Sequence, residues 1–198
     1  MSRIVNVNSR NFLTNLLDYQ EGMKVSRAPD VLRTEHVGNC LALAMCDNDG
    51  IGGLAHIYSA NRTEKFLMYH VAYPYFIIFN RPLIIAETVV DDMLYEMQKH
   101  GSDLTDVVAK MAGEQKPSKT SHRSRFFSGG DKKSKIVKAE LRKYDIPLIA
   151  EDLYYPRAKK VSQRKVIDFD LATKELRITY LTRYKSKSKP DEIFHGII

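Results

Sequence analysis

The feature that most constrains the fold is a stretch at residues 37–56 that has the pattern of a β-hairpin. Apolar residues alternate over residues 41–45, a polar turn follows at residues 47–50, and residues 51–56 form a second short apolar run. Period-two spacing interrupted by an Asp/Asn/Gly cluster predicts two antiparallel strands. Because a hairpin brings its two outer ends together, the thiol of Cys40 and the imidazole of His56 are predicted to lie side by side.

This pairing suggests an activated nucleophile. A cysteine needs a base within hydrogen-bond reach, and backbone N–H groups that hold the developing oxyanion. Gly38 lets the backbone come close, and Gly38 and Asn39 are the candidates for supporting the oxyanion loop. The alternative is structural, since a cysteine beside a strand commonly packs as a small hydrophobe and a histidine is commonly a satisfied core residue.

Length and cysteine content bound the class of protein. The 198 residues are predicted to form a single domain over 1–198 with a sizeable core. No apolar run reaches the ~18 residues of a membrane span, and no signal peptide is seen, so we expect a cytoplasmic protein without membrane insertion. Cys40 and Cys46 would lie ~20 Å apart on a strand, too far for a disulfide. No zinc-ligand spacing appears, and we expect neither a metal nor a cofactor.

The formal net charge of +7 is concentrated rather than spread evenly. Lysine and arginine crowd into residues 116–135 and 157–165. Basic blocks suit nucleic acid, an anionic membrane or an acidic protein. No nucleic-acid-binding module is recognisable, so we expect no nucleic-acid partner and favour a solvated basic surface.

Other elements follow from periodicity and capping residues. Strands are predicted at residues 23–26, 31–36 and 147–153, and a hairpin from residues 165–170 and 175–181. Helices are predicted over residues 83–100, 102–113 and 132–144. Together these elements indicate an α/β fold.

The hairpin residues resemble a known signature. The run Gly38, Asn39, Cys40 before an apolar strand, followed by Ile-Gly-Gly and a histidine at 56, is similar to the signature of the CheD family of chemoreceptor glutamine deamidases. Residues 147–153, Pro-Leu-Ile-Ala-Glu-Asp-Leu, also match that family, although tyrosines replace the two glycines that usually follow. The resemblance is strongest over residues 23–56 and 129–181, with apparent insertions at 57–82 and 114–128. Two other positions depart from the family: Asn39 replaces a serine, and Lys133 replaces an asparagine.

This resemblance implies a layered α-β-β sandwich of mixed or antiparallel sheet with about three main helices. It also implies a protein-glutamine glutaminase with a triad of Cys40, His56 and Thr34, without a cofactor. The implied substrate is the cytoplasmic helices of chemoreceptors in chemotaxis adaptation, with a partner in the CheC phosphatase family. Two alternatives stay open: a toxin-like or effector-like deamidase of another protein, and a non-catalytic binding module.

Overall fold

The computed structural model describes residues 2–7, 22–37, 40–58, 60, 84–113, 132–153, 161–184 and 191–198. The predicted insertions at 57–82 and 114–128 lie almost entirely outside these ranges, as do Gly38 and Asn39. Within the described ranges, no helix is long and apolar enough to cross a membrane.

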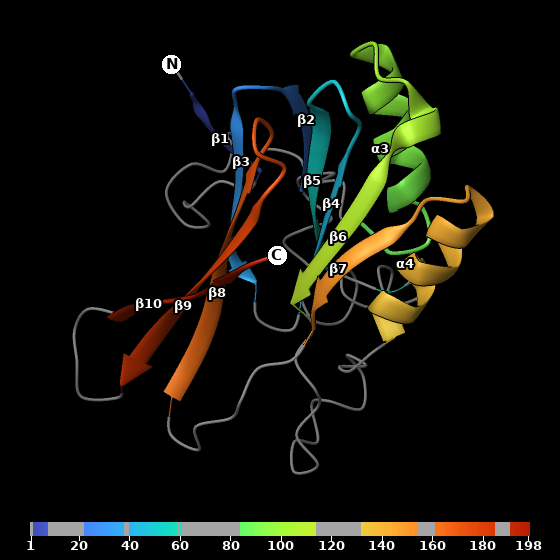
Figure 1. Ribbon diagram of the computed structural model, residues 1–198. Helices are drawn as coiled ribbons and strands as arrows, with labels where there is room; N and C mark the ends of the chain where they lie inside the picture. The colour runs from blue at the N-terminus through green and yellow to red at the C-terminus, as the bar shows by residue number, and fades with distance from the viewer. Residues whose placement is uncertain are drawn as a thin grey trace, which may run out of the picture.

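Two five-stranded sheets form the framework of the fold (Figure 1). The outer sheet contains, in spatial order, β1 (Ile4–Asn6), β3 (Val31–Val37), β8 (Val161–Asp170), β9 (Leu176–Tyr184) and β10 (Asp191–Ile197). The central sheet contains β2 (Met23–Arg27), β5 (Ile51–Ile57), β4 (Leu41–Cys46), β6 (Val108–Gly113) and β7 (Leu148–Asp152). Neighbouring strands are antiparallel except for the parallel pairs β1–β3 and β6–β7.

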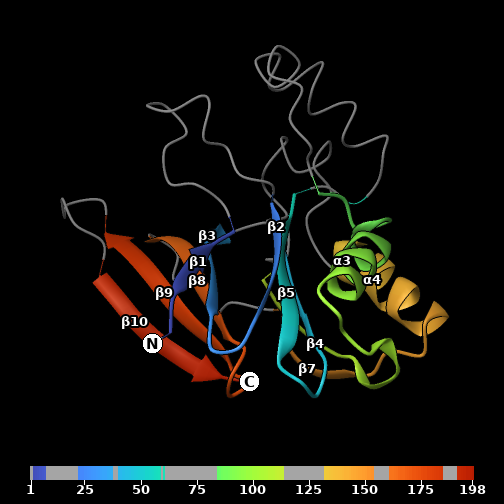
Figure 2. The ribbon, with the colours of Figure 1, turned by 90° about the horizontal axis from the view of Figure 1, so that it is seen from above.

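The elements stack in three layers: helices, central sheet and outer sheet (Figure 2). Helices α3 (Val89–Lys99) and α4 (Lys132–Lys143) cover one face of the central sheet. The apolar stripe of α3 is buried there together with the β4 residues that face the helices. The opposite face of the central sheet packs against the outer sheet through a second apolar cluster, called here the inter-sheet cluster, which includes Ala42, Ala112, Ile167 and Phe169. The chain therefore has a mixed α/β architecture with two sheets, as the sequence predicted.

Each predicted strand is confirmed, including both hairpins, but the helix predicted over residues 102–113 is wrong. A 3₁₀ turn, η2 (Leu104–Asp106), and strand β6 occupy this segment. The spacing of Leu104, Val107, Val108 and Met111 is that of a helix, whereas the consecutive β-branched residues Val107 and Val108 favour a strand. Pairing with both β4 and β7 satisfies the backbone of β6 in the middle of the sheet. The described residues therefore contain two α-helices rather than three.

Two adjacent glycines allow the β4–β5 hairpin to fit between the other layers. A Cβ on Gly52 would lie 2.6 Å from the carbonyl oxygen of Met45 and 2.7 Å from a methyl group of Leu171, on the outer-sheet side. A Cβ on Gly53 would lie 2.9 Å from Met93 of α3, on the helix side. The Gly-Gly step therefore lets both neighbouring layers approach β5 closely.

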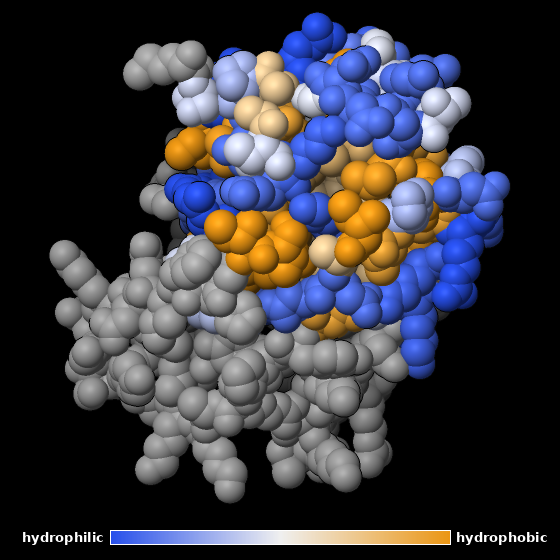
Figure 3. All heavy atoms as spheres, in the orientation of Figure 1, coloured by the Kyte–Doolittle hydropathy of each residue, from blue (hydrophilic) through white to orange (hydrophobic). Residues whose placement is uncertain are grey.

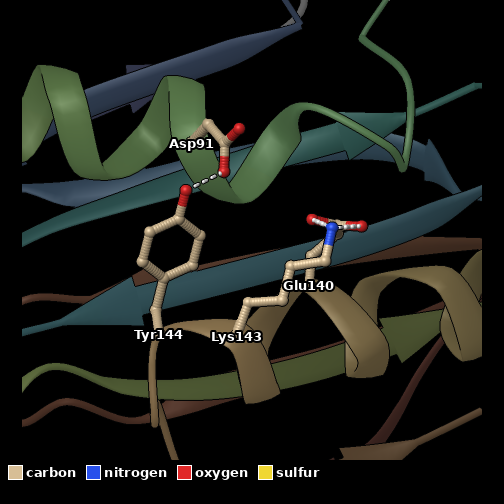
Figure 4. Close-up of polar contacts among 4 residues, drawn as sticks. All are labelled: Asp91, Glu140, Lys143 and Tyr144. Atoms are coloured by element: carbon tan, nitrogen blue, oxygen red, sulfur yellow. Dashed lines mark hydrogen bonds and ion pairs between the residues drawn. The ribbon is translucent and has the colours of Figure 1, made fainter.

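The two helices are joined by a polar contact at the molecular surface (Figure 4). The hydroxyl of Tyr144, just after α4, donates to Oδ1 of Asp91 on α3 at 2.6 Å. This hydrogen bond raises the pKa of Tyr144 above its ordinary value. On α4 itself, Lys143 pairs with Glu140 at 2.7 Å. Of these exposed contacts only the Tyr144–Asp91 hydrogen bond joins the two helices, and their buried apolar faces supply most of the stabilisation.

Hydrophobic atoms also gather at the surface over β6 and β7, at one end of the central sheet (Figure 3). Strand β7 is an edge strand of that sheet, and its Ile149 is 55% exposed. A groove between β7 and α4 is lined by Leu141, Ile146 and Leu148, with Lys138 and Glu151 paired at its rim.

Candidate functional site

The best-defined polar contact between the two sheets joins Thr34 and His56. The hydroxyl oxygen Oγ1 of Thr34 lies 2.8 Å from Nδ1 of His56, and both residues are buried. Thr34 comes from β3 of the outer sheet and His56 from β5 of the central sheet. The contact therefore exists only when the two sheets are packed together.

Cys40 lies immediately before β4, at the end of the hairpin that carries His56. Leu41 pairs with Ile57 and Ala42 with His56, so Cys40 is two residues from the direct partner of His56. Cys40 is half-buried and packs against the inter-sheet cluster, to which Ala42 also belongs. The side chains of Cys40 and His56 therefore lie on the same face of the central sheet. Diagonal neighbours of this kind have Cα atoms ~7–8 Å apart.

The backbone at Cys40 is held by the end of β6. Gly113 has a φ of +121°, a conformation that residues with a Cβ rarely adopt. A Cβ at this position would lie 2.6 Å from the carbonyl oxygen of Cys40 and 2.9 Å from Val37. Only glycine lets β6 close over the peptide that carries the thiol.

The electrostatic surroundings of Cys40 favour a neutral thiol. Burial raises its pKa to about 11, and the positive charge of Lys133 acts in the opposite direction. Lys133 is buried in the first turn of α4, a turn that contains no acidic residue. A buried ammonium at a helix N-terminus is unfavourable for the helix, because the macrodipole already places positive charge there.

The imidazole of His56 is also held by ring stacking on one of its faces. The ring of Tyr58 stacks on it with centroids 4.4 Å apart and an interplanar angle of 7°. The sequence patterns gave Tyr58 no role, since it lies in the predicted insertion at residues 57–82. The missed signal is its position two residues after His56, which places both side chains on one face of an extended chain.

The structure thus brings three of the predicted site residues into one region. Thr34 and His56 are in contact, and Cys40 lies on the same inter-sheet face. Both cysteines are free, as predicted. In the described part of the chain, no group of three or more His, Cys, Asp or Glu side chains is placed to hold a metal ion.

Comparison with known proteins identifies similar sequences. The profile of the family described as CheD chemotactic sensory transduction matches residues 80–179. A probable chemoreceptor glutamine deamidase CheD from Clostridium novyi is 31% identical over 131 residues, which cover 66% of this chain and 74% of the relative. A protein of the same description from the Hall strain of Clostridium botulinum is 28% identical over 132 residues, covering 66% and 75%. These matches show that the chain belongs to the CheD family.

Proposed function

We propose that the chain is a cysteine-dependent protein-glutamine deamidase that converts glutamine side chains of chemoreceptors to glutamate. Its relatives carry the name of that activity, with the qualification "probable". The family match begins at residue 80, after the β4–β5 hairpin, so the residue assignments are supported by the resemblance of the hairpin motif and by geometry. The observation that carries them is the buried Thr34–His56 contact, with Cys40 on the same face.

In this proposal Thr34 sets the tautomer of His56. When Nδ1 carries the proton and donates it to Oγ1 of Thr34, Nε2 becomes the basic nitrogen of the ring. The stacked ring of Tyr58 fixes the plane of the imidazole. A thiol with a pKa of about 11 is protonated at neutral pH, so His56 must remove the proton during the reaction.

The reaction then proceeds through a thioester. Sγ of Cys40 attacks the side-chain carboxamide carbon of a glutamine as His56 takes the thiol proton. Backbone N–H groups of the loop at Gly38, Asn39 and Cys40 are proposed to hold the oxyanion. His56 returns the proton to the leaving ammonia, and the C–N bond breaks. Water, deprotonated by His56, then attacks the thioester, and glutamate and the free thiol are released.

The proposed substrate is the cytoplasmic helical region of a chemoreceptor, which implies that the protein works in the cytoplasm. A CheC-family phosphatase is the proposed partner. The proposed reaction needs no cofactor, since the chain, the substrate and water supply every proton and bond in the scheme.

Mass spectrometry tests this proposal directly. Receptor cytoplasmic fragments are incubated with the wild type, Cys40→Ala and His56→Gln, and peptides are searched for the conversion of glutamine to glutamate with release of ammonia. We expect conversion by the wild type alone. Conversion of another protein but of no receptor fragment would favour the effector-like alternative. An absence of conversion, with intact receptor binding, would favour the binding module.

A further inference from the structure

A second polar cluster bridges the two sheets, away from Thr34 and His56. It consists of Asp152 at the end of β7, Lys165 on β8 and Tyr180 on β9, and is called here the lysine tie. Nζ of Lys165 lies 3.4 Å from the backbone oxygen of Asp152 and 3.9 Å from its Oδ2. The hydroxyl of Tyr180 donates to the same Oδ2 at 3.4 Å, and its ring centroid lies 5.4 Å from Nζ of Lys165.

Strand register places the lysine tie at the level of the candidate site. Across the central sheet, His56 pairs with Ala42, Ala42 with Ala112, and Ala112 with Asp152. Directly opposed residues of neighbouring strands share a face, so His56 and Asp152 point toward the outer sheet from opposite ends of one row. With strands ~4.8 Å apart, three steps separate them by roughly 14 Å. The two alanines between them keep the middle of the row apolar.

Residues of the outer sheet contact this row at both ends. Thr34 reaches His56 at one end. At the other end Lys165, which pairs with Val37 of the same strand β3 and with Tyr180, reaches Asp152. Both polar contacts therefore depend on one quantity, the separation of the two sheets at this row.

Stability alone is a poor explanation for the lysine tie. The side chain of Lys165 is 5% exposed, and burial lowers the pKa of its ammonium. Buried ion pairs contribute little net stability, because removing both charges from water offsets their attraction, and apolar side chains of similar volume often do as well. What such a pair supplies is a defined geometry, since a charge in an apolar layer has few alternative partners.

We propose that Lys165 and Asp152 are positioning residues, which fix the sheet separation at which Thr34 orients the imidazole of His56. They touch neither the substrate nor Cys40 in this scheme, and act through the Thr34–His56 contact. The inference rests on the proposed deamidase function.

The test uses Lys165→Met, which keeps the length of the side chain without its charge, with Lys165→Arg as the conservative variant. Receptor-fragment deamidation gives kcat and KM, and ¹⁵N-histidine NMR follows the ring of His56, assigned by its loss in His56→Gln. We expect Lys165→Met to lower kcat by roughly 100-fold, the effect of an ångström-scale misplacement, with KM nearly unchanged. The His56 ring nitrogens should shift, and Lys165→Arg should recover most of kcat. The melting temperature should fall, because the carboxylate of Asp152 loses its buried partner, so kcat and the ring shift are measured well below the unfolding transition.

Asp152→Asn serves as the second variant, because it removes the charge while keeping an acceptor for Tyr180. Should Lys165→Met fail to fold, the same loss of kcat and the same NMR shift are expected in Asp152→Asn. Lys99→Met, at an exposed pair on α3, is the matched control and should change nothing. Unmoved His56 signals and an unchanged kcat in the folded variants would overturn the inference. Retained deamidation by Cys40→Ala would instead overturn the proposed function, and the two failures are therefore distinct.

Discussion

At the scale of single residues, the central feature is Cys40, the proposed nucleophile, whose raised pKa favours the protonated thiol. Burial places the pKa of Cys40 at about 11, and the nearby positive charge of Lys133 limits the increase. Since a thiol reacts as its thiolate, the proposed reaction needs a base that removes this proton. This favours proton transfer within the reaction over a preformed thiolate–imidazolium pair.

Replacing Lys133 by methionine should therefore raise the pKa of Cys40 further. The ammonium stabilises the thiolate, so its removal moves ionisation to a more alkaline pH. The measurement is the rate of iodoacetamide alkylation of Cys40 as a function of pH, with peptide mapping to separate it from Cys46. Lys135→Met, at an exposed position in the same helical turn, is the control. A profile identical to that of the wild type in Lys133→Met would contradict this electrostatic role.

Thr34 should matter through its hydroxyl. Thr34→Val keeps the shape of the side chain but removes the oxygen that contacts Nδ1 of His56, and should lower kcat by roughly 10- to 100-fold, part of the ~10²–10⁴-fold that acid–base catalysis supplies. Thr34→Ser retains the hydroxyl and should stay close to the wild type. Deamidation kinetics on a receptor fragment give the comparison. Equal activity of the valine and serine variants would show that the hydroxyl does not orient the ring.

At the scale of elements, the β4–β5 hairpin is set by sequence patterns that operate locally. Its alternation, polar turn and glycine step are all visible in the chain, and its strands were predicted to within about a residue. Strand β6 was predicted to be a helix because its apolar spacing is helical. Its hydrogen-bonded partners, β4 and β7, are distant in sequence, and pairing with them makes the segment a strand. Local sequence patterns predict an element correctly where pairing with distant strands does not favour a different secondary structure.

Gly52→Ala should destabilise the fold by about 1–3 kcal/mol, the usual range for overpacking. The added methyl group would meet the backbone oxygen of Met45 and the side chain of Leu171, so a layer must shift. Gly101→Ala is an informative comparison, because Gly101 has a φ of +87° with no atom near the position of a Cβ. It should lose about 1 kcal/mol through backbone strain alone. Urea unfolding of both variants gives the free energies, and a smaller loss for Gly52→Ala than for Gly101→Ala would contradict the close-packing explanation.

At the scale of the whole molecule, polar groups join layers that the apolar clusters hold together. Nζ of Lys110 on β6 donates to the backbone oxygens of Lys174, at 2.7 Å, and of Ile198, at 2.9 Å. Lys110 thereby links the central sheet to the β8–β9 turn and to the residue after β10 of the outer sheet. Lys110, the lysine tie and the Thr34–His56 contact all bridge the two sheets.

Lys110→Met should lower the free energy of unfolding by about 1–3 kcal/mol, because two partly buried carbonyl groups lose their donor. Lys143→Met, which breaks an exposed pair on α4, should change it by less than about 0.5 kcal/mol. Thermal or urea unfolding measures both. Equal effects of the two substitutions would mean that the inter-sheet bonds of Lys110 contribute no more than a surface pair.

The candidate site was only partly predictable from the sequence. The proximity of Cys40 and His56 follows from hairpin logic, since both flank one local unit. The role of Thr34 came from a family resemblance, because its contact with His56 links residues 22 positions apart across two sheets. Lys133, which acts on Cys40 electrostatically, and Lys165, in the row opposite Asp152, reach the region through tertiary packing that no local pattern encodes.

Thr34 and His56 come from different sheets, and this has a consequence for when the site forms during folding. During synthesis, or after partial unfolding, the segment that carries the thiol can form its hairpin before the two sheets pack together. At that stage the hydroxyl of Thr34 does not yet contact the imidazole of His56, so the ring is not oriented. The proposed chemistry then starts only on completion of folding. Competence to deamidate would thus report that the two halves of the protein have docked.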